Sequence, residues 1–330
     1  MTAALSAFYP QPIEHVRAVD PASTVLADVL QTVRVSSVCY GKMELGAPWG
    51  VAVEPHEKTS FIAILDGAAL LEVDGQPDAI PLGKGDLCVF PHGSGHVLRD
   101  ALTTEATSLQ ALIAGCGSDP VRFGGPGPGC TLVGGALELE AASENPVVGI
   151  LPNLIVSRGE HGRAAPWLEP MLSFMAHELG SERPGGQAVI RLLATVLFVQ
   201  VARTHLTENL GKESGWLRGL SEPHIASALS LIHQNPEGAW TVATLARRVG
   251  MSRSAFADRF TSLVGEPPLH YVTRMRMQQA SALLRDGAAV AEAAERAGYG
   301  SEAAFSKAFK RWIGQAPGAY RRSTRTAVSV

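Results

Sequence analysis

Cysteine is scarce in this chain. The 330 residues contain only Cys39, Cys88, Cys116 and Cys130, and no two of them form a C-x-x-C pair. A zinc ribbon and a thioredoxin-like redox motif are therefore excluded, and four thiols are too few for a disulfide scaffold in a chain of this length. A Cys116–Cys130 disulfide across the glycine-rich loop 115–130 is disfavoured in a reducing cytoplasm.

Long apolar runs and a targeting segment are also missing. The first twenty residues meet proline and charge too early for a secretory signal. The most apolar stretch, 188–202, has 15 residues and contains Arg191 and Gln200, so it is too short and too polar to cross a bilayer. We therefore expect a cytoplasmic protein with no membrane partner.

Charge is sparse and unevenly distributed. Charged residues make up 18% of the chain and hydrophobic residues 46%, which permits a large core. The net charge of −3 hides an asymmetry: residues 222–330 hold 14 Lys and Arg against 8 Asp and Glu, whereas residues 1–221 hold 14 against 23. An anionic partner is therefore expected to bind the C-terminal third.

The hydrophobic pattern changes from strands to helices along the chain. Residues 33–140 contain short apolar runs separated by glycine turns every 8–12 residues, which is typical of a small antiparallel barrel or sandwich. From about residue 166 the period is helical, and residues 188–206 carry one apolar stripe. The stripe is compatible with packing on the barrel and with a dimer seam; its members are Ile190, Leu193, Ala194, Leu197 and Val201.

An internal repeat indicates the fold of the last hundred residues. Phe256, Phe260 and Gly265 recur 49 positions later as Phe305, Phe309 and Gly314. In each copy a short helix ends at a glycine, a serine caps the next helix, and that helix has phenylalanines at i and i+4. This is the pattern of a helix-turn-helix motif, in which the second helix enters the DNA major groove.

Residues 223–325 resemble the DNA-binding domain of the arabinose-operon-regulator (AraC/XylS) family. The segments that carry the resemblance are "MSRSAFADRFTSLVGEPP" (251–268) and "GYGSEAAFSKAFKRWIGQAPGAYRR" (298–322). The resemblance implies a transcription regulator that binds double-stranded promoter DNA through both motifs. This resemblance implies a regulator, so we expect no enzymatic activity.

Residue roles on DNA follow from the helical faces and from this resemblance. On both recognition helices the face opposite the phenylalanines is expected to contact base edges. These predicted base contacts are Arg253, Ser254, Ala257, Asp258, Glu302, Ala303, Ser306 and Lys307. A further set is predicted to contact phosphates or to be solvated surface charge: Ser252, Arg276, Ser301, Lys310, Arg311, Arg321 and Arg322.

The stretch "GDLCVFPHGSGH" (85–96) resembles the second motif of the cupin barrel, G-x5-P-x-G-x2-H, ending at His96. Cupin enzymes hold a divalent metal with this histidine and with H-x-H-x3–4-E from a first motif. Here "EPHEKTS" replaces that first motif, so two of its three ligands are changed. Glu54, His56 and His96 remain as an alternative metal set, but no cofactor is expected and a metal-dependent cupin enzyme is disfavoured.

We therefore predict an α+β protein with a cupin-like sensor and dimerisation domain (1–206), a linker (207–222) and a DNA-binding domain with two helix-turn-helix motifs (223–325). The barrel is expected to bind a small-molecule effector and the protein to be a homodimer. An alternative is a metal- or redox-responsive regulator that uses barrel Cys and His residues. The predicted pocket residues are Trp49, His56, Phe61, Ile64, Leu71, Phe90 and His96.

Overall fold

The computed structural model describes residues 20–115, 120–140, 147–159, 166–179, 184–211 and 215–327. The chain divides into two compact units. The first is a β-rich unit, Val29–Asn209, whose end lies near the predicted boundary at residue 206. The second is a helical unit that begins at Leu210 and also includes the chain up to Asp28. Cys116 lies outside the described residues. The predicted loop 115–130 is not a loop throughout, because residues Val121–Gly124 form a strand and another strand begins at Gly129.

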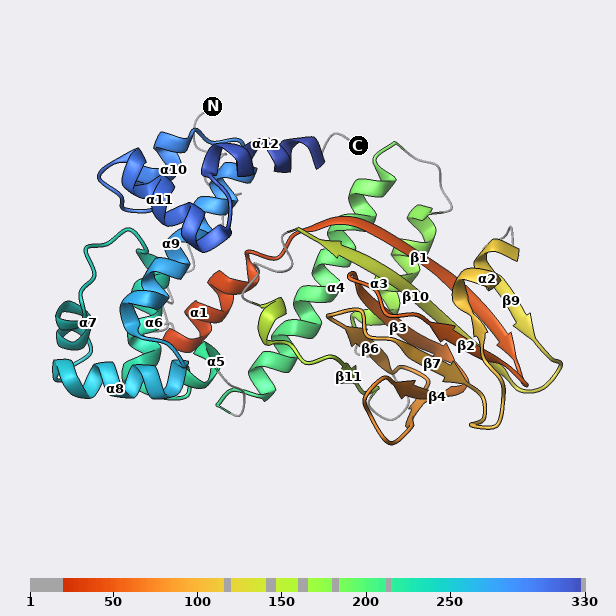
Figure 1. Ribbon diagram of the computed structural model, residues 1–330. Helices are drawn as coiled ribbons and strands as arrows, with labels where there is room; N and C mark the ends of the chain where they lie inside the picture. Colours follow the sequence, from red (N-terminus) through yellow and green to blue (C-terminus); the bar gives the residue numbers. More distant parts are fainter. Residues whose placement is uncertain are drawn as a thin grey trace, which may run out of the picture. The chain divides into compact units, whose positions relative to one another are not determined.

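The β-rich unit consists of two sheets (Figure 1). The larger sheet has the order β11-β6-β3-β10-β1-β9 and the smaller one β5-β4-β7-β2-β8. Neighbouring strands are antiparallel except for the β1–β9 and β2–β8 pairs. The larger sheet contains β1 (Val35–Gly46), β3 (Thr59–Asp66), β6 (Leu87–Phe90), β9 (Val121–Gly124), β10 (Gly129–Leu139) and β11 (Ile155–Ser157). The smaller sheet contains β2 (Gly50–Val53), β4 (Ala68–Val73), β5 (Ile80–Gly83), β7 (His96–Arg99) and β8 (Thr107–Ser108).

The two sheets enclose a hydrophobic core, as the sequence predicted, but they do not close into a barrel. Among the described residues, no strand continues the hydrogen-bond ladder from one sheet to the other, so the two sheets remain separate. Side chains from both sheets and from α2 (Leu109–Gly115) fill the space between them. A two-sheet architecture with this strand pattern is consistent with the cupin fold.

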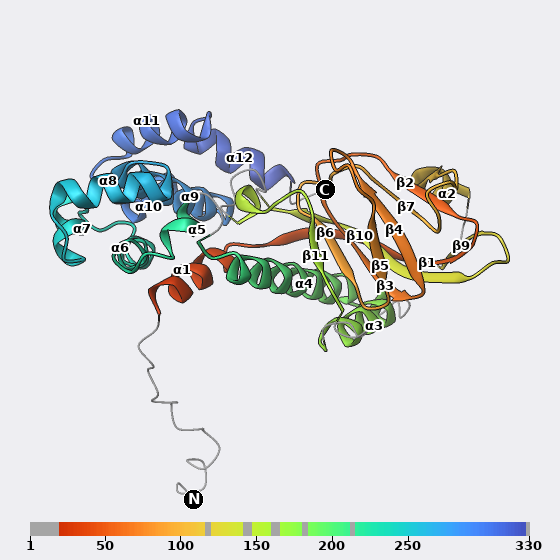
Figure 2. The ribbon, with the colours of Figure 1, turned by 90° about the horizontal axis from the view of Figure 1, so that it is seen from below.

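A helical layer covers the outer face of the larger sheet. Helix α4 (Gly186–Glu208) packs against α3 (Leu168–Leu179) and against β1, and a short 3-10 turn, η2 (Val148–Ile150), precedes β11. Figure 2 shows α4 running along this sheet. Four residues of the apolar stripe that the sequence predicted on α4 are buried, Ile190, Ala194, Leu197 and Val201, and the fifth, Leu193, is half-buried. Packing on the sheet is therefore confirmed.

Helix α4 is longer than the apolar run that defined it in the sequence. Its 23 residues are long and apolar enough to cross a membrane by length and composition alone, and it is the one such helix among the described residues. Core helices pass the same test, and the stripe on α4 contacts the sheet.

The helical unit contains the repeat. A linker was predicted for 207–222, but within it α5 (Trp216–Gly219) packs against α8 (Arg253–Val264), so this part of the segment belongs to the helical unit. The remaining helices are α1 (Pro21–Leu30), α6 (Pro223–Gln234), α7 (Val242–Arg248), α8 (Arg253–Val264), α9 (Pro268–Arg285), α10 (Val290–Arg296), α11 (Glu302–Ile313) and α12 (Pro317–Ala327).

Candidate nucleic-acid interface and sensor domain

The first helix-turn-helix motif is formed by α7 and α8. Gly250, with φ of 72°, closes the turn after α7 in a conformation that only glycine adopts freely. Ser252 then caps α8, because its Oγ accepts a hydrogen bond from the Ala255 N–H at 3.3 Å. Phe256 and Phe260 on α8 are fully buried. The capping serine and the buried pair are as the sequence predicted.

The second motif repeats this construction in α10 and α11. Gly298 also has φ of 72°, and Ser301 Oγ accepts from the Ala304 N–H at 3.3 Å. Phe305 and Phe309 are fully buried in a core that includes side chains of α9. Both recognition helices end at a left-handed glycine, Gly265 or Gly314. The predicted pair of helix-turn-helix motifs is therefore confirmed.

Burial of the phenylalanines leaves one face of each recognition helix uncovered. All eight predicted base contacts lie on these faces: Ala257 and Ser306 are half-buried and the other six are exposed. Side chains such as Arg253 and Lys307 therefore reach solvent from the N-terminal half of each helix, the part that meets base edges in this class of motif. Their contacts with DNA stay a prediction.

The structure gives Arg276, a predicted phosphate contact, an internal role. Its guanidinium donates to the backbone carbonyls of Pro236, Glu237 and Gly238 at 2.8, 3.4 and 2.8 Å. These bonds fasten α9 to the loop between α6 and α7. Arg321 similarly donates to the Ala288 carbonyl at 3.2 Å.

The other five predicted phosphate contacts are exposed: Ser252, Ser301, Lys310, Arg311 and Arg322.

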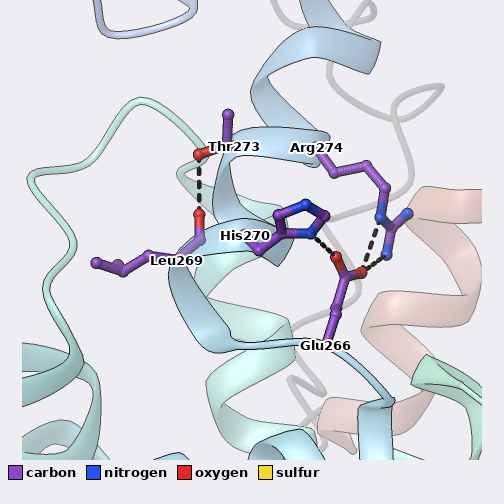
Figure 3. A network of polar contacts seen from close by, with 5 residues as sticks. All are labelled: Glu266, Leu269, His270, Thr273 and Arg274. Carbon is purple, nitrogen blue, oxygen red and sulfur yellow. Dashed lines mark hydrogen bonds and ion pairs between the residues drawn. The ribbon is translucent and has the colours of Figure 1, made fainter. Parts of the chain in front are cut away.

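A polar cluster that the sequence pattern did not predict lies at the connection between α8 and α9. Glu266, which directly follows Gly265, accepts hydrogen bonds from His270 and Arg274 of α9 (Figure 3). The sequence contains a signal for this cluster, because Glu266, His270 and Arg274 are spaced four residues apart. This spacing places His270 and Arg274 on one face of a helix. Two further side chains that were not singled out, His233 and Tyr271, are joined by a hydrogen bond of 2.7 Å.

The cupin-like segment forms β6, a turn and β7, and so crosses from one sheet to the other. Gly93 in this turn has φ of 64°, and a Cβ there would lie 2.0 Å from the His56 carbonyl oxygen. The position therefore requires glycine. His96 is buried, its Nδ1 lies 2.8 Å from the Ser94 carbonyl oxygen, and its ring stacks on Phe90 with centroids 4.0 Å apart. Burial lowers the pKa of His96.

The alternative metal set is not assembled. Within the described ranges, no three His, Cys, Asp or Glu side chains converge so that they could hold a metal ion. Glu54 is exposed, and His56 Nδ1 instead accepts from the Lys58 N–H at 3.2 Å. The geometry gives no support to a metal centre built from Glu54, His56 and His96.

The apolar residues predicted to line the pocket do not all lie on the same side of the larger sheet. Trp49, Ile64, Leu71 and Phe90 belong to the core between the sheets. Phe61 is equally buried but lies outside that core, because it alternates along β3 with Ile62 and Ile64, which belong to the core. Phe61 therefore does not line the interior as predicted.

The described cysteines are free thiols. Burial raises the pKa of Cys88 to about 12 and that of Cys130 to about 11, whereas a redox sensor needs a readily ionised thiol. Cys39 is exposed. This arrangement does not favour the redox-responsive alternative.

Known proteins resemble the chain over nearly its whole length. A cupin family model matches residues 24–207, and a helix-turn-helix domain model matches residues 245–323. A putative AraC-like transcription regulator of Streptomyces antibioticus is 35% identical over 300 residues, which cover 90% of this chain and 98% of the relative. The transcriptional regulator AlkR of Acinetobacter baylyi is 33% identical over 247 residues, which cover 73% of this chain and 80% of AlkR.

Among solved structures, the DNA-binding domain of the transcriptional factor AdpA, in complex with a target DNA, is 36% identical. It covers 31% of this chain and 93% of its own length, with a TM-score of 0.30. The curated relatives are named as regulators. The chain therefore belongs to the AraC family of DNA-binding transcription regulators, with an N-terminal cupin domain and a C-terminal domain of two helix-turn-helix motifs.

Proposed function

We propose that the protein reads a promoter with α8 and α11 together and that a small molecule bound in its cupin domain controls this binding. One observation carries the DNA part of the proposal. Both recognition helices are capped, buried on their phenylalanine face and uncovered on the polar face that includes Arg253 and Lys307. The surplus of basic residues in 222–330 supports an interaction with phosphates.

The effector is proposed to be a small, largely apolar molecule. The space between the two sheets is filled by aromatic and aliphatic side chains, among them Trp49, Leu71 and Phe90, and the ring of His96 stacks on Phe90. A ligand that enters this core would meet apolar side chains and one polar group, which suits an apolar molecule that needs one hydrogen bond for orientation. A ligand changes DNA affinity only if it binds the DNA-competent arrangement with a different affinity.

The working form is proposed to be a cytoplasmic homodimer without enzymatic activity. The support for a dimer is an exposed apolar surface on the helical layer of the β-rich unit: Leu192 and Val196 on α4 are 65% and 44% exposed, and Phe174 on α3 is 47% exposed. These residues lie off the stripe that packs on the sheet. A self-complementary contact through this surface would bring two DNA-binding domains to one promoter.

The test is a titration of the purified full chain against two labelled duplexes. One is the region upstream of its own gene and the other is a scrambled duplex of the same length and composition. We expect tighter binding to the upstream region at physiological salt, and metal analysis of the same sample should find no stoichiometric metal. Stoichiometric metal together with equal, weak binding to both duplexes would contradict the proposal.

A further inference from the structure

Figure 3 shows a polar cluster of Glu266, His270 and Arg274 at the start of α9. Glu266 Oε1 accepts from Nε and Nη2 of Arg274 at 2.9 and 2.6 Å, and Oε2 accepts from Nδ1 of His270. Each carboxylate oxygen thus has its own partner. The side chain of Glu266 is only 18% exposed, so it is held in one orientation.

The cluster is anchored in the core of the first motif. The Arg274 guanidinium lies over the ring of Tyr271, 4.7 Å from its centroid. Tyr271 is buried and packs edge-on against Phe260 of α8, with ring centroids 5.8 Å apart. Charge-assisted hydrogen bonds are stronger than neutral ones, especially where solvent is partly excluded. The Glu266 carboxylate is therefore a fixed point relative to α8.

The cluster also reaches the second motif. The ring of His270 packs against Trp312 in the last turn of α11, with centroids 4.5 Å apart and planes 44° apart. A continuous series of contacts therefore runs from the C-terminal end of α8, through Glu266 and His270, to the C-terminal end of α11. The predicted base contacts lie toward the other end of both helices. Because a 12-residue helix is about 18 Å long, a small rotation at the joined ends displaces the base-facing ends appreciably.

The repeat shows that a single motif does not need this cluster. With the offset of 49 residues, Glu266, His270 and Arg274 correspond to Gln315, Ala319 and Ser323. The neighbouring tyrosine is kept in both copies, as Tyr271 and Tyr320. The second motif therefore forms without a carboxylate, a histidine or an arginine at these positions. Of the two copies of the repeat, only the first has these three residues, and its His270 contacts Trp312 of the second.

We propose that Glu266 and His270 are positioning residues that fix the orientation of α11 relative to α8, so that the protein accepts its two DNA subsites at a single spacing. The inference rests on the proposed function, in which both helices enter the same DNA. Connecting helix α9 and the core around Phe305 and Phe309 hold α11 in place. The contact of His270 with Trp312 removes the remaining freedom at the end of α11.

The experiment first selects bound duplexes from a random-sequence pool with the full-length wild-type protein, which identifies two subsites and their preferred spacing. Dissociation constants are then measured for the best duplex and for the same duplex with one base pair inserted between the subsites. The insertion separates the subsites by about 3.4 Å and rotates them by about 35°. The variants are His270→Ala and Glu266→Gln, with Thr273→Ala as control.

Thr273 is a matched control because it lies one turn from His270 and its hydroxyl donates only to the Leu269 carbonyl of its own helix. We expect the insertion to weaken binding about tenfold or more for wild type and Thr273→Ala, but only about two- to threefold for His270→Ala and Glu266→Gln. The thermal unfolding midpoint of His270→Ala should change little, because 55% of this side chain is exposed.

A merely structural role would weaken binding to both duplexes equally and leave their ratio unchanged. The inference is overturned if His270→Ala and Glu266→Gln both show the wild-type ratio. If the wild-type protein selects no sequence from the pool, the proposed function fails first, and that result is distinct from an unchanged ratio.

Discussion

Arg276 and Lys310 carry the same charge in different surroundings. The guanidinium of Arg276 is occupied by three backbone carbonyls of the loop between α6 and α7, whereas Lys310 is exposed on α11. We expect Arg276→Ala to lower the free energy of unfolding by about 1–3 kcal/mol, because three backbone carbonyls of this loop lose a charged donor. Urea denaturation measures the loss.

Lys310→Ala is the control for this change. We expect it to leave stability unchanged and to reduce the slope of log affinity against log salt by roughly one, as loss of one phosphate contact does. The opposite pattern, with a stable Arg276→Ala protein and a reduced salt slope, would establish Arg276 as the phosphate contact that its sequence context predicted.

Arg253 and Lys307 are the strongest candidates for direct base readout. Both are exposed on the uncovered faces of the recognition helices. We expect Arg253→Ala to weaken binding to the promoter duplex by roughly 1–3 kcal/mol, and Lys307→Ala by less, because lysine makes a single contact. Titrations against promoter and scrambled duplexes measure the difference. Equal losses on both duplexes would show that these side chains touch only phosphate.

His233 makes the stability of the helical unit depend on pH. Burial, and secondarily the charge of Arg274, lowers the pKa of His233 to about 4. The unfolded chain binds this proton near pH 6.5 and the folded chain does not, so the stability is present above pH 6.5 and is lost as the pH falls toward 4. Denaturation at pH 7.5 and pH 5 should differ by about 2 kcal/mol from this group.

His233→Gln should remove most of this difference, because glutamine keeps a polar partner for Tyr271 but binds no proton. His177→Gln, at an exposed position on α3, should leave the difference as it is in wild type. If His233→Gln loses as much stability at low pH as wild type does, another group causes the loss.

At the scale of elements, the serine caps are the local feature that starts each recognition helix. Ser252→Ala should lower the free energy of unfolding by about 1 kcal/mol, because the Ala255 N–H loses its acceptor. Ser254→Ala is the matched control: it lies two residues further on an exposed face and should leave the thermal midpoint unchanged. A midpoint lowered equally by both changes would mean that the cap contributes nothing specific.

Elements with a strong local signal were predicted well. Both motifs could be located from the sequence because their signals are local. Each one combines a glycine that ends a helix, a serine that caps the next helix and two phenylalanines four residues apart. Strand alternation was harder to use. Both faces of β3 are buried, one against the other sheet and one under the helical layer, so hydrophobicity alone placed Phe61 on the wrong face.

At the scale of the whole molecule, the exposed apolar surface of the β-rich unit gives a prediction about assembly. We expect the wild-type protein to sediment as a dimer and the double variant Leu192→Glu, Val196→Glu to sediment as a monomer, because two charges would be buried in the contact. The control is Arg191→Glu, at an exposed position on the same helix. An unchanged dimer in the double variant would place the subunit contact elsewhere.

The sequence by itself determined the family, the strand-rich and helical halves, the two helix-turn-helix motifs and the uncovered face of each recognition helix. The two motifs depend on local chemistry, and the 49-residue repeat shows the same local pattern twice. Only the tertiary structure decided that the sheets stay open, that Arg276 binds backbone carbonyls, and that Glu266 and His270 reach Trp312. The physical reason is that such contacts join residues as far apart as His270 and Trp312, whose proximity depends on how the helices pack rather than on any pattern along the chain.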